Sequence, residues 1–409
     1  MWTLILDAMF RSFITQGALR VVYPDGQARL YGEGDAPVQI RLQADDLPKN
    51  LVLRTDLALG EAYMNGALEI VDDDLDGFMA LVAVNIARSR GLWWRNAILR
   101  GRRFRRVFDQ WNPISRARSN VAHHYDLDAR LYDLFLDEDR QYSCAYFRHP
   151  DMGLEAAQEA KKRHIGKKLL LQPGMKVLEI GCGWGGLSLS LARDYGVEVL
   201  GVTLSTEQHR IASARARDMG LSDKVRFELR DYRTVTGQFD RVVSVGMFEH
   251  VGAPHYREYF RHIHARLKED GVALVHTIGR SGPPGTTSPW ITKYIFPGGY
   301  VPALSEMSAA VEKEGLCATD VEVWRLHYAE TLKHWYDRFM TRQSDALALY
   351  DDRFCRMWRY YLKASEYAFR HTGQTVFQYQ LARDQEAVPL TRDYLYSEQE
   401  SEARLKAAE

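Results

Sequence analysis

Short runs rich in apolar residues recur along the second half of the chain, and most of them lead through a turn into a helical pattern. The runs lie at residues 176–181, 197–203, 225–229, 239–245 and 272–277. Apolar runs without alternation are typical of strands that are buried on both faces of a parallel sheet. Strands that alternate with helices predict an α/β domain with a doubly wound sheet, which binds ligands beyond the carboxyl ends of its strands.

The first part of the chain follows another pattern. β-patterned runs at residues 19–23, 28–31 and 38–42 are separated by turns, and helical patterns follow at 57–64 and 75–87. The patterns predict a smaller α+β domain, and no catalytic motif occurs in it. The expected division is 1–100 for this N-terminal domain, 101–120 for a basic linker, 121–395 for a catalytic domain and 396–409 for a charged tail.

The segment around the linker has an unusual composition. Residues 88–118 hold ten arginines against the single acid Asp109, with Trp93, Trp94 and Trp111 between them. A solvated helix and linker would have this composition. An interfacial patch would have it too, with arginines on lipid phosphates and tryptophans at headgroup depth. The two interpretations are compatible, and we keep both.

Overall composition narrows the class of protein. Of 409 residues, 46% are hydrophobic and 26% are charged, with 54 Lys+Arg against 54 Asp+Glu, so no net field attracts an anionic polymer. Asp7 and Arg11 make the first 17 residues too polar for a signal peptide or a membrane span. Cys144, Cys182, Cys317 and Cys355 show neither paired nor metal-ligand spacing. We therefore expect free thiols in a cytoplasmic protein without a bound metal.

A glycine-rich loop after the first strand of the sheet predicts a nucleotide-type cofactor. Gly181, Gly183 and Gly185 allow a tight turn and a close approach of the backbone to a ligand. A dinucleotide site would add a longer glycine motif and an acid after the second strand, where this chain has Thr203-Leu-Ser205. No phosphate-binding lysine follows the loop, which argues against an ATP site.

Polar residues near the next strand ends fit a different cofactor. Gln208 is the nearest long polar side chain after the second strand, and Ser205 is placed to cap the following helix. Asp231, after the third strand, can accept a hydrogen bond from an adenine amino group, with Tyr232 packed beside it. Glu179 lies two residues before the glycine loop. Together these features favour S-adenosylmethionine over NAD.

From Asn120 onward the sequence closely resembles the cyclopropane-fatty-acyl-phospholipid synthases and the related mycolic acid methyltransferases. The matching motifs are Ala122-His-His-Tyr-Asp126, Tyr142-Ser-Cys-Ala-Tyr146, Val177-Leu-Glu-Ile-Gly-Cys-Gly-Trp-Gly185, Val202-Thr-Leu-Ser205, Gly246-Met-Phe-Glu-His-Val-Gly252, His276-Thr-Ile278, Tyr294-Ile-Phe-Pro-Gly-Gly299 and His334-Trp-Tyr-Asp337. The resemblance implies a class I S-adenosylmethionine-dependent methyltransferase fold. Residues 1–100 resemble the extra N-terminal domain of the phospholipid-acting bacterial members. That implies an unsaturated membrane phospholipid as substrate, and an enzyme that binds transiently to the anionic inner face of the membrane.

The resemblance also implies roles for individual residues. It assigns cofactor contacts to Tyr142, Ser143, Gly181, Gly183, Gly185, Thr203 and Gln208. The residues at the strand ends add Glu179, Ser205, Asp231 and Tyr232 to the expected cofactor set. The five positions that hold a bicarbonate ion in the family correspond to Cys144, Glu249, His276, Ile278 and Tyr336. Bicarbonate would offset the charge of a carbocation and accept a proton as the ring closes. Glu249 would orient the ion as an acceptor. Tyr294, Phe147, Trp290 and Phe296 are expected to face the cation or to line the acyl channel.

Several alternatives stay open at the level of sequence. Methyl transfer could end in a cyclopropane ring or in a methyl- or methylene-branched chain. The chain could also be a lipid-binding protein with a vestigial cofactor pocket. A nucleic-acid methyltransferase would carry an amide-methylating or cysteine-nucleophile motif, and neither is present, so we expect no nucleic-acid partner. His250 and His255 are interpreted as structural, and His123 and His124 as packing or substrate-contacting. Some relatives have a cysteine where this chain has Ser365. Whether the chain forms a homodimer stays open.

Overall fold

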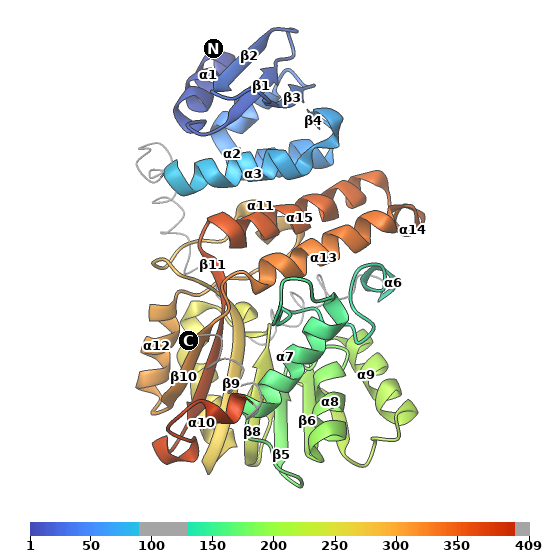
Figure 1. The fold of residues 1–409 in the computed structure, drawn as a ribbon, viewed down its shortest axis with the longest axis vertical. Coiled ribbons are helices and arrows are strands. Elements are labelled where there is room, and N and C mark those ends of the chain that lie inside the picture. The colour runs from blue at the N-terminus through green and yellow to red at the C-terminus, as the bar shows by residue number, and fades with distance from the viewer. Residues whose placement is uncertain (90–128, 397–409) are drawn as a thin grey trace, which may run out of the picture.

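Two sheets with a layer of helices between them make up residues 1–89 and 129–396, the part of the chain that the computed structural model describes (Figure 1). The predictions for His123, His124 and the arginine-rich segment from residue 90 onward lie outside these residues. Within the described ranges, no helix is both long enough and apolar enough to cross a membrane.

The N-terminal unit is a four-stranded sheet with three helices. In chain order its elements are α1 (Trp2–Phe13), β1 (Ala18–Val22), β2 (Ala28–Gly32), β3 (Val38–Leu42), α2 (Leu47–Met64), β4 (Leu68–Ile70) and α3 (Leu75–Arg88). The strand order is β2-β1-β3-β4, with β1 parallel to β3 and the other pairs antiparallel. The three strands and two helices predicted here are present, although α2 begins ten residues earlier than expected. The helix α1 and the strand β4 were not predicted.

The larger sheet carries the catalytic motifs. Its strands are β5 (Lys176–Ile180), β6 (Glu198–Thr203), β7 (Val225–Leu229), β8 (Phe239–Val245), β9 (Leu267–Arg280), β10 (Cys317–Val323) and β11 (Gln374–Ala382). Their order is β10-β11-β9-β8-β5-β6-β7, and β5 to β9 are parallel to one another. At one edge, β11 runs antiparallel to both of its neighbours, β9 and β10. All five predicted strands are confirmed. This is the Rossmann-like sheet of a class I methyltransferase, as predicted.

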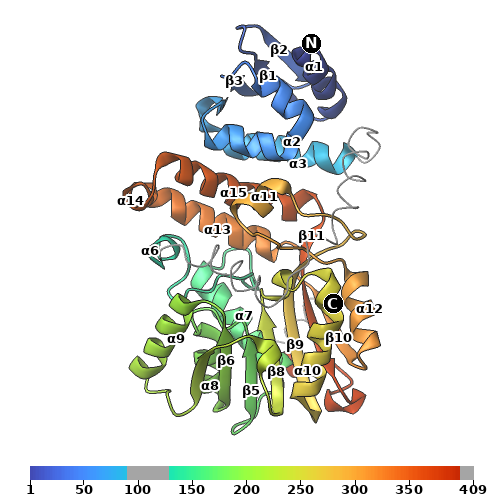
Figure 2. The same cartoon turned by 180° about the vertical axis from the view of Figure 1, so that it is seen from behind.

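Helices cover both faces of this sheet (Figures 1 and 2). They are α7 (Leu154–Lys168), α8 (Gly186–Tyr195), α9 (Thr206–Asp218), α10 (Tyr256–Arg266) and α12 (Leu304–Lys313), and a short helix α6 (Ala129–Tyr132) precedes them. Single 3₁₀ turns lie at η1 (Val71–Asp73), η3 (Tyr232–Thr234), η4 (Phe248–His250), η5 (Ala253–His255), η6 (Gln385–Ala387) and η7 (Asp393–Leu395).

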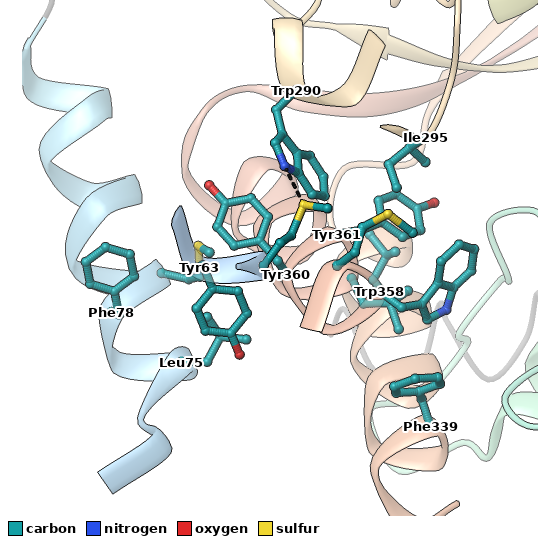
Figure 3. Close-up of a cluster of buried hydrophobic side chains, with 14 of the residues drawn as sticks. Tyr63, Leu75, Phe78, Trp290, Ile295, Phe339, Trp358, Tyr360 and Tyr361 are labelled. Carbon is teal, nitrogen blue, oxygen red and sulfur yellow. Dashed lines mark hydrogen bonds between the residues drawn. The ribbon is translucent and has the colours of Figure 1, made fainter. Parts of the chain in front are cut away.

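A middle layer of helices joins the N-terminal unit to the sheet. It consists of α11 (Pro289–Tyr294), α13 (His327–Thr341), α14 (Gln343–Leu349) and α15 (Asp352–His371). Helix α15 contacts α2 and α3 on one side and α13 on the other. In Figure 3, Trp290 and Tyr360 of the middle layer pack beside Tyr63 of α2, and the indole Nε1 of Trp290 lies 3.2 Å from the sulfur of Met64. One apolar core therefore runs through both parts of the molecule.

Candidate active site

A cavity of about 1250 Å³, its open mouth included, lies at the carboxyl ends of β5, β6, β7 and β8. This is the edge at which doubly wound sheets bind their ligands. Nine of the residues that the sequence predicts for the cofactor line this cavity: Tyr142, Ser143, Glu179, Gly181, Gly183, Thr203, Gln208, Asp231 and Tyr232.

The three loop glycines have different surroundings. Gly183 has φ +53° and faces open space, because a Cβ atom built on it would meet nothing within 4 Å. A Cβ on Gly181 would lie 2.9 Å from Met247. Gly185 does not line the cavity: it caps the start of α8, and a Cβ there would lie 2.6 Å from the Phe227 ring. The backbone can therefore approach a ligand at Gly181 and Gly183, while Gly185 serves close packing of the helix on the sheet.

A hydrogen-bonded corner follows β6. The Thr203 hydroxyl donates to Gln208 Oε1 at 2.8 Å, which orients the Gln208 amide beside the cavity. Ser205 was predicted as a cofactor residue, but it is buried outside the cavity lining. Its hydroxyl accepts a hydrogen bond from the Gln208 backbone N–H at 3.2 Å and so caps α9. This corrects the role of Ser205, since its side-chain oxygen is used by the helix.

Two acidic residues lie at different depths of the cavity. Arg233 donates to both carboxylate oxygens of Asp231, at 2.7 and 2.9 Å. Glu179 is buried at the floor, where the Ser188 hydroxyl of α8 donates to it. Burial raises the pKa of Glu179 to about 8, so its neutral form is favoured at neutral pH. Of these two lining residues, Asp231 is therefore the one that carries a negative charge, and Arg233 holds that carboxylate in place.

A second cavity, of about 650 Å³, adjoins the first. The two share Tyr142, Ser143, Gly246 and His250 as wall residues. Four of the residues predicted to hold bicarbonate line this second cavity: Cys144, Glu249, His276 and Ile278. Much of the remaining wall is apolar and includes Ile291 and Phe296.

Glu249 has one engaged and one unengaged carboxylate oxygen. Its Oε1 accepts a hydrogen bond from the Ile278 backbone N–H at 2.6 Å, which joins η4 to β9. Its Oε2 is buried and has no partner of ordinary hydrogen-bond geometry among the described residues, although the Thr277 hydroxyl lies near enough to the carboxylate to lower its pKa. Burial raises the pKa of Glu249 to about 7. A buried, unsatisfied carboxylate oxygen is costly, and one that lines a cavity indicates a ligand position.

His276 is held by the neighbouring antiparallel strand. It pairs in register with Gln378 of β11, whose Nε2 lies 3.1 Å from His276 Nδ1. Burial lowers the pKa of His276 well below its usual value, so the ring is neutral. Cys144 is also buried, and burial raises the pKa of its thiol, which keeps it protonated.

The fifth predicted residue, Tyr336, is not brought to this cavity. Its ring faces α15, where the Lys363 Nζ lies 4.3 Å from the ring centre. Tyr328, near the start of the same helix α13, lines the cavity instead. Eight residues along an α-helix shift a side chain by about 12 Å along the axis and by about 80° around it. The prediction was therefore wrong in placing Tyr336 at this cavity, because Tyr336 lies about two turns further along α13. The tyrosine of α13 that lines the cavity is Tyr328.

Other predicted side chains divide between the cavity and the packing around it. Phe296 lines the second cavity, whereas Phe147 stacks on His334, with ring centres 5.5 Å apart. Trp290 and Tyr294 face α2 of the N-terminal unit.

Several polar residues also differ from their predicted places. His250, interpreted from sequence as structural, lines both cavities, and burial lowers its pKa to about 4. His255 lines the first cavity, where its Nδ1 lies 3.0 Å from a Glu258 oxygen. Ser365 lies on α15 and lines neither cavity.

Comparison with known proteins adds to this geometry. The family model described as mycolic acid cyclopropane synthetase matches residues 113–379, and a domain of unknown function matches residues 5–84. The cyclopropane-fatty-acyl-phospholipid synthase of Escherichia coli (strain K12) is 39% identical over 354 residues, covering 86% of this chain and 89% of that protein. Tuberculostearic acid methyltransferase UfaA1 of Mycobacterium tuberculosis is 35% identical and covers 93% of this chain and 91% of its own.

A solved structure agrees with these relatives. The cyclopropane synthase MmaA2 from Mycobacterium tuberculosis matches with a TM-score of 0.62 at 34% identity, over 66% of this chain and 99% of that one. The matched family segment contains both cavities. The chain therefore belongs to the cyclopropane synthase family of S-adenosylmethionine-dependent methyltransferases.

Proposed function

We propose that this enzyme transfers the methyl carbon of S-adenosylmethionine onto the cis double bond of an unsaturated phospholipid acyl chain and forms a cyclopropane ring. The observation that carries the proposal is the junction of the two cavities. A polar cavity with exposed glycine backbone meets an apolar cavity that holds a buried, unpartnered carboxylate oxygen. The name of the Escherichia coli relative, which matches most of both chains, supports a phospholipid as substrate.

The first cavity fits the cofactor by the chemistry of its lining. The open space at Gly183 admits a ligand against the backbone, and the Asp231 carboxylate suits an adenine amino group. Thr203 and Gln208 lie between these points and suit ribose hydroxyls. S-adenosylmethionine supplies an activated methyl group on a sulfonium when bound. A structure of the relative CmaA1 contains SAH, which supports the same cofactor in this chain.

The second cavity fits a small protonated oxyanion. Glu249 Oε2 offers an acceptor. The Gln378 amide donates to His276 Nδ1, so in a neutral ring the proton lies on His276 Nε2, which can donate to a ligand. Tyr328 also lines the cavity, and its hydroxyl is a group that can donate a hydrogen bond. Bicarbonate supplies negative charge and a base when bound. The role of the side chains is to orient it and to exclude water.

A branched product is the second candidate. UfaA1, which matches 93% of this chain, is named a methyltransferase and not a cyclopropane synthase. The same residues would bind cofactor and acyl chain, and the outcome would differ in which proton leaves after methyl transfer. The position of the base relative to the added methyl group decides whether the product is a cyclopropane ring or a branched chain.

We further propose that the N-terminal unit brings the enzyme to the inner face of the membrane. Large apolar side chains are exposed on it, with Leu4 66%, Leu30 57% and Leu53 54% accessible. The arginine-rich segment that follows would add attraction to anionic lipid. Vesicle binding should therefore require anionic lipid and weaken at high salt. Equal, salt-independent binding to neutral vesicles would contradict this proposal.

Mass spectrometry of lipids tests the reaction. Purified enzyme, S-adenosylmethionine and vesicles of a mono-unsaturated phospholipid should give acyl chains heavier by one CH₂. Catalytic hydrogenation under conditions that reduce alkenes should leave this product unchanged if it is a ring, and reduce it if it is a methylene branch. Chains that gain no CH₂ would overturn the proposed function.

A further inference from the structure

Residues 141–143 form a strap that lies between the two cavities and helix α7. Ser143 lines both cavities, and Gln141 lines the first. Gln158 of α7 donates through Nε2 to the Gln141 and Ser143 carbonyl oxygens, at 3.1 and 3.0 Å. One turn further along the same helix lies Lys161, whose side chain is completely buried. A fully buried lysine is rare, and it requires a reason.

The Lys161 ammonium points at the strap. Its Nζ donates to Gln141 Oε1 at 2.7 Å and to Ser143 Oγ at 2.8 Å. Both of these acceptors are neutral. Burial lowers the pKa of Lys161 to about 8, so the ammonium form still predominates at neutral pH.

The nearby acids are engaged elsewhere. Asp137 accepts hydrogen bonds from the backbone N–H groups of Gln141 and Asp139. Asp139 is paired with Lys162 and Arg215. Among the described residues, no carboxylate hydrogen-bonds to Lys161, although Asp137 and Asp139 lie near enough to stabilise its charge. Its direct hydrogen bonds all go to the strap.

The direction of this hydrogen bond sets the role of the serine. An ammonium group has donors and no acceptor, so Ser143 Oγ must accept from Lys161. The Ser143 hydroxyl proton is then free to point toward a ligand at the wall that both cavities share. Lys161 thereby makes Ser143 a donor and places a positive charge behind it, and the two together favour an anionic group.

The residues that line the first cavity indicate which anionic group this is. Asp231 and Tyr232 lie toward the carboxyl end of β7, and Ser143 lies at the wall shared with the second cavity. A cofactor with its adenine at Asp231 would bring its amino-acid end to the strap. The α-carboxylate is the anionic group of S-adenosylmethionine.

We propose that Lys161 is a positioning residue that creates, through Ser143, the subsite for the α-carboxylate of the cofactor. The inference rests on the proposed cofactor and adds the residue that secures its amino-acid end. Lys161 does not touch the ligand; it fixes the direction of the hydroxyl that does.

Calorimetry with two ligands tests this role. S-adenosylhomocysteine carries the α-carboxylate, and 5′-methylthioadenosine keeps the adenosine and the thioether but lacks the amino-acid end. Lys161→Met should weaken binding of S-adenosylhomocysteine by about tenfold to a hundredfold, as expected for the loss of a charge-assisted interaction. Binding of 5′-methylthioadenosine should stay within about twofold of wild type, by the additivity of separate contacts.

Two further variants keep the test sharp. Ser143→Ala, a smaller change at the cavity wall, should show the same selective loss, and the double variant should lose little more than either single one. Lys162→Met is the matched control, because the neighbouring Lys162 pairs with Asp139 and Glu159 and not with the strap. Lys162→Met should hardly change the ratio of the affinities for S-adenosylhomocysteine and 5′-methylthioadenosine.

The outcomes separate this inference from the proposed function. A wild-type protein that binds neither ligand would overturn both. A wild type that binds both, with Lys161→Met and Ser143→Ala each weakening the two ligands equally, would overturn the inference alone. Binding of S-adenosylhomocysteine that Ser143→Ala leaves unchanged would also overturn the inference alone, and this result would hold even if Lys161→Met failed to fold.

Discussion

The two cavities are built in different ways. One wall of the cofactor cavity is built from backbone, at the loop after β5 where Gly181 and Gly183 have positive φ. The second cavity is formed by side chains from separate segments, and Cys144, Glu249 and Tyr328 come from three of them. A cavity made of backbone depends on a few residues that are adjacent in sequence. One made of side chains depends on how distant elements pack, and it can be altered one group at a time.

The largest effect should come from closing the backbone-built cavity. Gly183→Val places a β-branched side chain at φ +53° and in the space that a ligand would occupy. We expect no measurable binding of S-adenosylhomocysteine by calorimetry. Gly185→Ala is the contrasting variant, because its Cβ would press on Phe227 outside the cavity. It should lower the melting temperature while the folded fraction still binds the ligand. Tight binding by Gly183→Val would remove the glycine loop from the site.

The next effect concerns the side-chain-built cavity. Glu249→Gln keeps the size of the side chain, and its amide oxygen can still accept from the Ile278 N–H, but the other carboxylate oxygen is replaced by an NH₂ group that donates and does not accept. Turnover on unsaturated phospholipid vesicles should fall on the order of 10²-fold, as for other positioned interactions in active sites. Binding of S-adenosylhomocysteine should stay near that of wild type. Added bicarbonate should partly restore turnover if the defect is weaker binding of the ion.

The same substitution has an opposite effect on stability. The pKa of Glu249 is raised to about 7, so the folded state holds this proton more tightly than the unfolded state does. Its contribution to stability is present below the unfolded pKa of about 4.5 and is lost as the pH rises through about 7. The free energy of unfolding of Glu249→Gln should therefore rise relative to wild type between pH 5 and pH 8, by up to about 3 kcal/mol. A loss of stability at pH 8 would contradict this.

The tyrosine pair on α13 sharpens the comparison. Tyr328→Phe removes a hydroxyl from the cavity wall and should lower turnover by about tenfold, the scale of one hydrogen bond to a charged group. Tyr336→Phe is the matched control on the same helix, since the Tyr336 ring faces Lys363. It should stay within about twofold of wild type, as expected away from the site. The reverse order of effects, measured under identical conditions, would restore Tyr336 to the site.

These differences explain how far the sequence could predict the molecule. Five of the seven strands of the larger sheet were predictable, because burial on both faces leaves an apolar run, as at residues 272–275 of β9. The glycine loop was predictable because positive φ restricts the residue type. Tyr336 was misplaced because a motif on a helix does not state which face meets the sheet. Lys161 gave no signal, since its partners Gln141 and Ser143 are neighbours only in space.

The smallest effect should come from the contact between the N-terminal unit and the second cavity. Helix α11 lies against α2, where a Cβ on Gly60 would meet the Trp290 ring at 2.4 Å (Figure 3). Ile291, the next residue of α11, lines the second cavity. Gly60→Ala should therefore displace α11 and reshape the acyl pocket, at a cost typical of overpacking. We expect kcat/KM on vesicles to fall by about threefold to tenfold, with binding of S-adenosylhomocysteine unchanged.

Gly34→Ala, in the same unit but with only ordinary contacts to Ala18, is the control and should leave both unchanged. Equal activity of the two variants would mean that the cavity wall is set by the catalytic part alone. A fall in cofactor binding by Gly60→Ala would mean that the two cavities do not respond independently.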